Sequence, residues 1–110
     1  MPPPRDDRLG VDVVAPPFFI EYESQFQALH SQIASETVRL VAHGEDAPPD
    51  AAAASKELES SLLQADELIK QMDIEARTSD GGAASRKALK ERVDVYRRGV
   101  KALRAEVTYF

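Results

Sequence analysis

Apolar side chains recur along this chain at alternating spacings of three and four residues in three separate stretches. That spacing places them on one narrow stripe of an α-helix, and such a stripe is stable only when it packs against others. The first stretch carries Phe19, Tyr22, Phe26, Leu29, Ile33 and, after a gap at Glu36, Leu40. The second carries Leu58, Leu62, Ala65, Ile69, Met72 and Ala76. The third carries Leu89, Val93, Tyr96, Val100, Leu103, Val107 and Phe110. The pattern therefore predicts three helices, over residues 17–43, 50–77 and 80–110.

Proline and glycine mark the ends of these predicted helices. Pro17 is tolerated in the first turn of the first helix, and Gly44 is a natural stop for it. The residues after Gly44 form a loop with two prolines. A second turn is expected at residues 78–82, where Ser79 or Asp80 is a suitable N-cap for the third helix.

Residues 1–16 differ in composition from the rest and are predicted to form a flexible, proline-rich arm. Five of the seven prolines stand within the first 17 residues, and proline does not sustain a helix interior. In the alternative, Val11, Val13 and Val14 pack on the helices as a short strap.

Three long helices joined by short loops favour one architecture. A chain of 110 residues is enough for one domain with a single core. Short connections make consecutive helices antiparallel. We therefore predict an all-α fold in which residues 17–110 form an antiparallel up-down-up three-helix bundle, with the small crossing angles and left-handed twist of a heptad-like repeat.

Composition narrows the class of function. The net charge of −5 argues against sequence-independent binding to nucleic acid, which needs a basic surface. Without cysteine the chain forms neither disulfides nor thiolate metal sites. No apolar run approaches the ~20 residues that cross a bilayer, and no signal peptide precedes the helices, so we expect this segment to be soluble.

Residues suited to catalysis are few. His30 and His43 stand thirteen residues apart, a spacing that does not form a helical metal pair, and both are predicted to be structural. Gly81 and Gly82 lack the strand and the Lys-Ser/Thr pair of a phosphate-binding loop. We therefore predict no enzyme activity, no cofactor and no metal. The enzymatic alternative is a pocket that uses His30 and nearby carboxylates, with loss of activity in His30→Ala as its test.

Charge is distributed unevenly among the predicted helices. Most acids lie in the first two, whereas the third is rich in lysine and arginine. Four of its cations share one side of the helix, and we call them the basic stripe: Lys90, Arg97, Lys101 and Arg104. In one interpretation the stripe pairs with acids of the neighbouring helices. In the other, it is the partner-binding site, a docking surface for an acidic protein.

Two further local features lead to expectations. Acid-before-base pairs with i, i+4 spacing are predicted at Asp66/Lys70, Asp73/Arg77 and Asp94/Arg98. Gly99 lies within the third helix, where it marks either the close approach of a neighbouring helix or a tolerated surface position.

The second predicted helix contains a recognisable segment. Its residues 65–77 read ADELIKQMDIEAR, in which Gln71-Met72-Asp73, an aliphatic residue and Glu75 are the most specific part. This segment resembles the second helix of the N-terminal (Habc-like) domain of Vti-type SNARE proteins. Tyr22-Glu23 followed by Phe26 resembles the start of that family's first helix, and the third predicted helix, with Tyr96, resembles its third. The similarity extends from Phe18 to Phe110.

The resemblance implies a role in vesicle trafficking. Vti-type proteins are Qb-SNAREs in membrane fusion among Golgi, endosomes and vacuole or lysosome, with a SNARE motif and a membrane anchor after the bundle. Their bundle docks ENTH-domain clathrin adaptors. The resemblance thus implies an interaction domain, on the cytoplasmic face of those membranes, that binds a sorting adaptor or regulates assembly with other SNAREs.

Two departures from the family pattern stand out. The sequence to Phe110 contains no SNARE motif or anchor, which favours a domain of a longer protein over a shortened relative, and residues 1–16 match nothing in the family. We expect a monomer. The alternative from another class is a structural oligomerisation module, unrelated to trafficking, whose helices pair between chains; light scattering separates the two.

Overall fold

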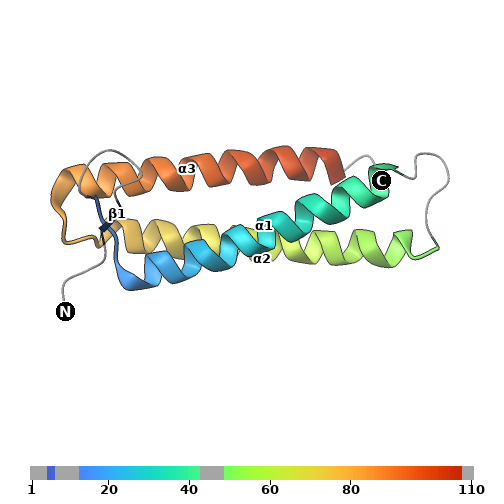
Figure 1. Ribbon diagram of the computed structural model, residues 1–110, viewed down its shortest axis with the longest axis horizontal. Helices are drawn as coiled ribbons and strands as arrows, with labels where there is room; N and C mark the ends of the chain where they lie inside the picture. Colours follow the sequence, from blue (N-terminus) through green and yellow to red (C-terminus); the bar gives the residue numbers. More distant parts are fainter. Residues whose placement is uncertain (1–4, 7–12, 43–48, 108–110) are drawn as a thin grey trace.

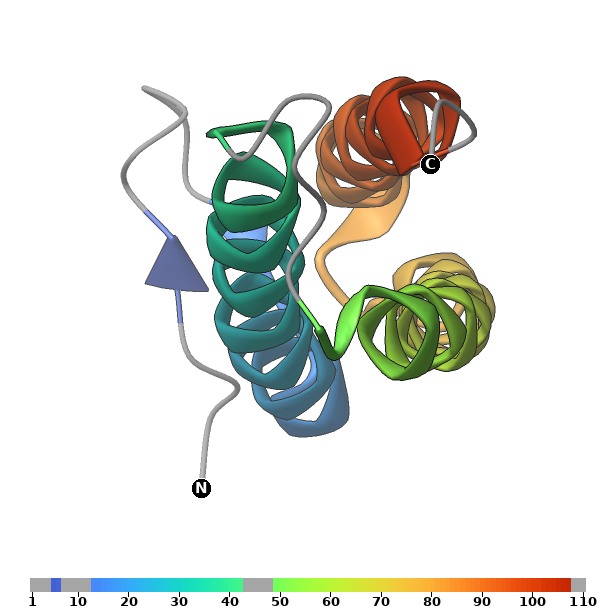
Figure 2. The same ribbon diagram turned by 90° about the vertical axis from the view of Figure 1, so that its right-hand side faces the viewer.

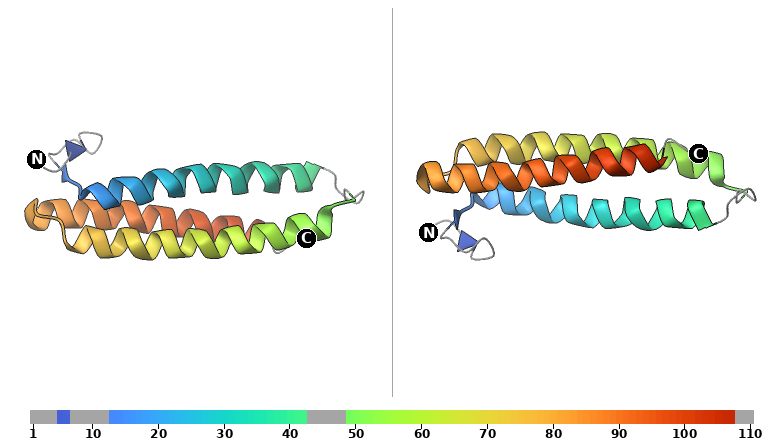
Figure 3. Two further views of the ribbon diagram at one scale, coloured as in Figure 1. Left: turned by 90° about the horizontal axis from the view of Figure 1, so that it is seen from below. Right: turned by 90° about the horizontal axis from the view of Figure 1, so that it is seen from above.

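The computed structural model describes residues 5–6, 13–42 and 49–107. Three long helices dominate these residues: α1 (Pro17–Ala42), α2 (Ala51–Arg77) and α3 (Gly82–Val107). They lie side by side in alternating direction, in a rod measuring 52 × 21 × 17 Å (Figures 1 and 3). The predicted all-α three-helix bundle is confirmed.

Seen along its length, the bundle places the three helices around one common core (Figure 2). The apolar stripes predicted from the sequence face this core. Its largest fully buried apolar side chains are Phe19, Phe26 and Ile33 of α1, Met72 of α2, Leu89 and Val93 of α3, and Val13. Tyr22 and Tyr96 are only half-buried, and each packs at the margin of the core.

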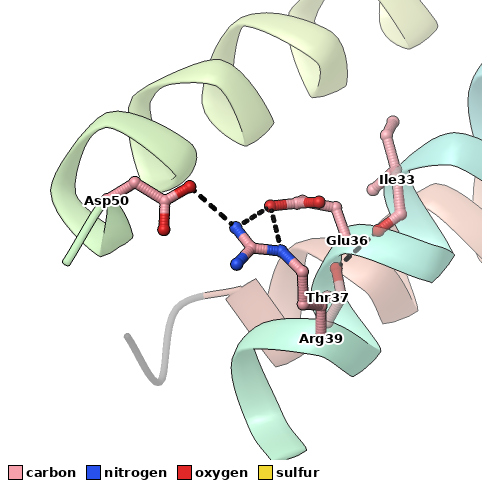
Figure 4. A network of polar contacts seen from close by, with 5 residues as sticks. All are labelled: Ile33, Glu36, Thr37, Arg39 and Asp50. Carbon is pink, nitrogen blue, oxygen red and sulfur yellow. Dashed lines mark hydrogen bonds and ion pairs between the residues drawn. The ribbon is translucent and has the colours of Figure 1, made fainter. Parts of the chain in front are cut away.

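The gap in the first stripe at Glu36 is filled by the next residue. Thr37 is buried, and its hydroxyl donates a hydrogen bond of 2.8 Å to the carbonyl oxygen of Ile33, one turn earlier. Glu36 instead bonds with Arg39, whose guanidinium also reaches Asp50 at 3.2 Å (Figure 4). The buried Thr37 hydroxyl thus has the hydrogen-bond acceptor that its burial requires. On the surface, the ion pairs of Arg39 with Glu36 and Asp50 connect the end of α1 to the start of α2.

The helix boundaries differ from the predicted ones by one or two residues. The predicted end at His43, the stop at Gly44 and residues 108–110 lie outside the described residues. The second helix starts at Ala51, and Asp50 is its N-cap residue, whose carbonyl accepts a bond of 2.8 Å from the amide of Ala54. The Asp50 side chain bonds with Arg39 and makes no capping bond. The third starts at Gly82, not at residue 80.

The predicted N-cap of α3 is therefore wrong. The Ser79 hydroxyl accepts a bond from the amide of Gly81 at 3.3 Å, before the helix begins, and donates to the carbonyl of Val14. Gly82 has a φ of +84°, a conformation that favours glycine. The Ser79 hydroxyl thus ties this turn to the segment that precedes α1.

That preceding segment packs against the α2–α3 turn, and we call residues 13–15 the strap. Val13 and Ala15 are fully buried, and the amide of Val14 donates to the Ser85 hydroxyl at 3.0 Å. A β-carbon on Gly81 would lie 2.5 Å from that of Val14, so only glycine lets the strap lie this close. The strap interpretation therefore holds for Val13, whereas Val11 lies outside the described residues.

Two short strands complete the described structure. β1 (Arg5–Asp6) pairs antiparallel with β2 (Val13–Val14), in the register Arg5 with Val14 and Asp6 with Val13. Because β2 belongs to the strap, this ladder lies at the end of the bundle where α2 turns into α3 (Figure 1).

Candidate protein-interaction surface

The seam between α2 and α3 is charged. Arg104 of α3 reaches across it to Asp66 of α2 at 2.7 Å, and Arg77 pairs with Asp73 at the same distance within α2. Of the three predicted i, i+4 pairs, only Asp73/Arg77 forms. Asp66 is engaged by Arg104, and Lys70 bonds with Glu67, three residues before it. Asp94 bonds with Arg97 and not with the predicted Arg98.

The four residues of the basic stripe have different surroundings. Arg104 is paired across the seam, and Arg97 is paired within α3 at 3.0 Å. Lys90 and Lys101 are exposed, and no described carboxylate forms an ion pair with either. The pairing interpretation therefore holds for Arg104, which neutralises an acid of α2, whereas the docking interpretation stays a prediction for the two lysines that face solvent.

Next to Lys90 the seam opens into a hollow of about 420 Å³. Its lining consists of Asp73, Ala76 and Arg77 from α2 and Arg86, Lys87 and Lys90 from α3. We call this the basic hollow. Arg77 belongs to it although the predicted basic stripe lies on the third helix alone, because the antiparallel packing brings the end of α2 beside the start of α3.

The seam between α1 and α3 holds a buried polar group instead. Glu23 of α1 is only 4% exposed. Its carboxylate is paired with Arg92 and accepts a hydrogen bond of 2.6 Å from the hydroxyl of Tyr96, both on α3. Gln27 donates to the same hydroxyl at 3.2 Å, and the Arg92 guanidinium lies 5.5 Å from the ring centre of Phe19. A desolvated carboxylate with several donors fixes the register of α1 against α3.

The environment of Tyr96 makes the stability of the bundle sensitive to high pH. Burial raises the pKa of the Tyr96 hydroxyl, and so does its hydrogen bond to the Glu23 carboxylate. A raised pKa means that the folded state holds this proton more tightly than the unfolded state does, in which the pKa is about 10. The stabilisation that this pKa difference gives the folded state is complete below about pH 10, the pKa of the unfolded state, and is lost as the pH rises through the pKa of the folded state.

We therefore expect alkaline conditions to destabilise the native chain more than a chain without this hydroxyl. Urea unfolding at a series of pH values above neutrality should show the free energy of unfolding falling more steeply in the native chain than in Tyr96→Phe. Parallel curves for the two proteins would contradict the assignment.

A second hollow, of about 290 Å³, lies along the same α1–α3 seam. Phe26, His30, Tyr96 and Gly99 are among its lining residues. His30 is half-buried against the Phe26 ring, with 5.8 Å between the ring centres, which is the structural position expected for it. A β-carbon on Gly99 would lie 3.5 Å from His30 Nε2, an ordinary contact, so this glycine is not required by a close approach of α1.

Groups suited to metal binding or to a membrane span were also sought. Within the described residues, no three His, Asp or Glu side chains gather closely enough to hold a metal ion. His43 lies outside that part of the chain. None of the three described helices combines the length and apolarity that crossing a bilayer requires.

Comparison with known proteins identifies the bundle. The family model described as the vesicle transport v-SNARE protein N-terminus matches residues 17–109, which include all three helices. No curated protein and no solved structure matches the chain. The chain belongs to the family of vesicle transport v-SNARE N-terminal domains, which makes it a regulatory domain of a vesicle-trafficking SNARE.

Proposed function

We propose that this bundle is the N-terminal domain of a Vti-type Qb-SNARE and that it docks a sorting adaptor with an ENTH domain. The family match supports the SNARE assignment, and the resemblance at residues 65–77 supports the Vti type. The membranes proposed are those of the Golgi, endosomes and vacuole or lysosome. Regulation of SNARE assembly, with other SNAREs as partners, is the second role that exposed faces of the bundle can serve.

The open part of the basic stripe carries the docking proposal. Lys90 and Lys101 are exposed on one side of α3 and form no ion pair with a described acid. Arg97 and Arg104 lie on the same side, but their charges are partly neutralised by Asp94 and Asp66. An acidic partner surface would meet uncompensated positive charge at the two lysines, which increases the association rate and selects for complementary partners.

The bundle is proposed to act as a monomer. The apolar stripes of all three helices are buried against one another within a single chain, so the core itself leaves no seam for a second copy. Light scattering at micromolar concentration tests this. A stable dimer would favour the alternative, a structural oligomerisation module.

Charge reversal at the two open lysines tests the docking site. Lys90→Glu/Lys101→Glu should weaken binding to a cognate ENTH domain by about 10-fold or more, because each exposed attraction becomes a repulsion. The remaining affinity should depend less on salt. Isothermal titration calorimetry at two salt concentrations measures both effects.

The matched control is Lys56→Glu/Arg98→Glu, which changes the net charge equally at exposed positions outside the stripe. Its affinity should stay near that of the native chain. If both variants lose the same affinity, the loss comes from the change in net charge and not from the stripe. If the stripe variant is folded and binds with native affinity, the stripe is not the interface.

A further inference from the structure

The basic hollow concentrates positive charge at one end of an acidic molecule. Three of its cations, Arg86, Lys87 and Lys90, come from the first turns of α3, and Arg77 comes from the last turn of α2. Asp73 is the one carboxylate in its lining. The chain as a whole has a net charge of −5, so this local excess is not a consequence of composition.

Much of this charge is uncompensated. Arg77 pairs with Asp73, and Arg86 donates to the backbone carbonyl of Ser79 at 3.2 Å. Lys87 and Lys90 are exposed and pair with no carboxylate among the described residues. The start of α3 also lacks an acid in its first turn, where a carboxylate would complement the helix dipole. A bound anion would relieve the repulsion among these cations.

The arrangement of the cations favours a compact ligand over an extended one. Farther along α3, the open cations Arg98 and Lys101 alternate with Arg97 and Arg104, which have acidic partners, whereas the hollow gathers four cations around one space. Four cations around about 420 Å³ suit clustered phosphates: lysine binds phosphate as a point charge, and arginine binds it through two parallel bonds. An extended acidic peptide would instead need open cations along the whole helix.

We infer that the basic hollow binds the phosphorylated headgroup of a membrane lipid. The hollow lies at the end of the rod where α1 and α3 begin and α2 ends (Figure 1). Phe18, at the start of α1, is 59% exposed at this end, and Ile20 is also exposed. Exposed apolar side chains at the same end of a molecule as a cationic site suit contact with a membrane interface. This inference does not rest on adaptor docking.

Vesicle flotation with the 110-residue chain tests the inference. Three vesicle compositions are needed: phosphatidylcholine alone, and phosphatidylcholine with either phosphatidylinositol bisphosphate or phosphatidylserine at the same total negative charge. Binding should be strongest to the bisphosphate vesicles, and soluble inositol trisphosphate should compete. Lys87→Glu/Lys90→Glu should weaken that binding by about 30-fold.

The matched control is Lys56→Glu/Lys101→Glu, which has the same net charge but alters a lysine near the start of α2 and one near the end of α3, away from the hollow. It should keep near-native binding to the bisphosphate vesicles, and circular dichroism should show both variants folded. Equal binding to phosphatidylserine vesicles, equal loss in both variants, or binding of the soluble headgroup without vesicle binding would each overturn the inference. Binding of polyglutamate in place of vesicles would overturn it in favour of an acidic protein. Adaptor docking is tested separately, with an ENTH domain and Lys90→Glu/Lys101→Glu. A failure of vesicle binding therefore does not decide whether the bundle docks an adaptor.

Discussion

Replacing Glu23 with alanine should lower the free energy of unfolding by about 3–5 kcal/mol. The carboxylate is buried between α1 and α3, where it is paired with Arg92 and accepts the hydrogen bond of Tyr96. The Arg92 side chain is only 11% exposed, so water does not replace the carboxylate that the substitution takes away from its guanidinium. Because a domain of this size is stable by only ~5–15 kcal/mol, the loss is a large part of the total.

Urea unfolding followed by circular dichroism measures this effect, with Glu21→Ala as the control. Glu21 lies two residues earlier on α1 and is exposed, so its removal should change the free energy of unfolding by less than about 0.5 kcal/mol. If the two variants unfold at the same urea concentration, the buried pair contributes no more than a surface charge.

The contrast between these two acids shows where sequence reasoning ends. Both stand early in a predicted helix, where the dipole favours a negative charge, and the sequence pattern treats them alike. Glu23 is buried because the angular position it shares with the apolar stripe meets Arg92 and Tyr96 on another helix. Helical periodicity identifies the buried face of one helix, but it does not show which residues of a second helix stand opposite.

The same reason explains the charge pairs. Asp66 has Lys70 one turn away in its own helix, yet it bonds with Arg104 on α3. The Arg77 side chain lines a hollow with cations of the next helix. Both the Asp66–Arg104 pair and the lining of the hollow depend on how far α3 is displaced along α2. The packing of the whole apolar stripes sets that displacement.

The elements that depend on local chemistry alone were predictable. The period of the apolar positions and the placement of proline and glycine were enough for the number, order and approximate ends of the helices. The strap was open to two interpretations because its burial requires Gly81, whose missing side chain makes room for Val14. That contact joins residues more than sixty positions apart, and no local pattern reports it.

The predicted stripe of α2 can be tested with two adjacent leucines. Leu62 is 3% exposed and belongs to the core, whereas its neighbour Leu63 is 66% exposed. Leu62→Ala removes the same atoms as Leu63→Ala, but only the former leaves a cavity among packed side chains. We expect Leu62→Ala to lower the free energy of unfolding by about 2–4 kcal/mol and Leu63→Ala to change it by less than about 0.5 kcal/mol.

Thermal and urea unfolding of both variants measure this difference, since the substitution, the helix and the local helix propensity are the same in each. Equal losses would mean that the stripe does not face the core as described. A large loss in Leu63→Ala alone would place inside a face of α2 that lies about 100° around the helix from the described one, so that α2 would be rotated about its axis relative to both of its neighbours. Because the Asp66–Arg104 pair depends on that register, the same result would also remove the described geometry of the α2–α3 seam.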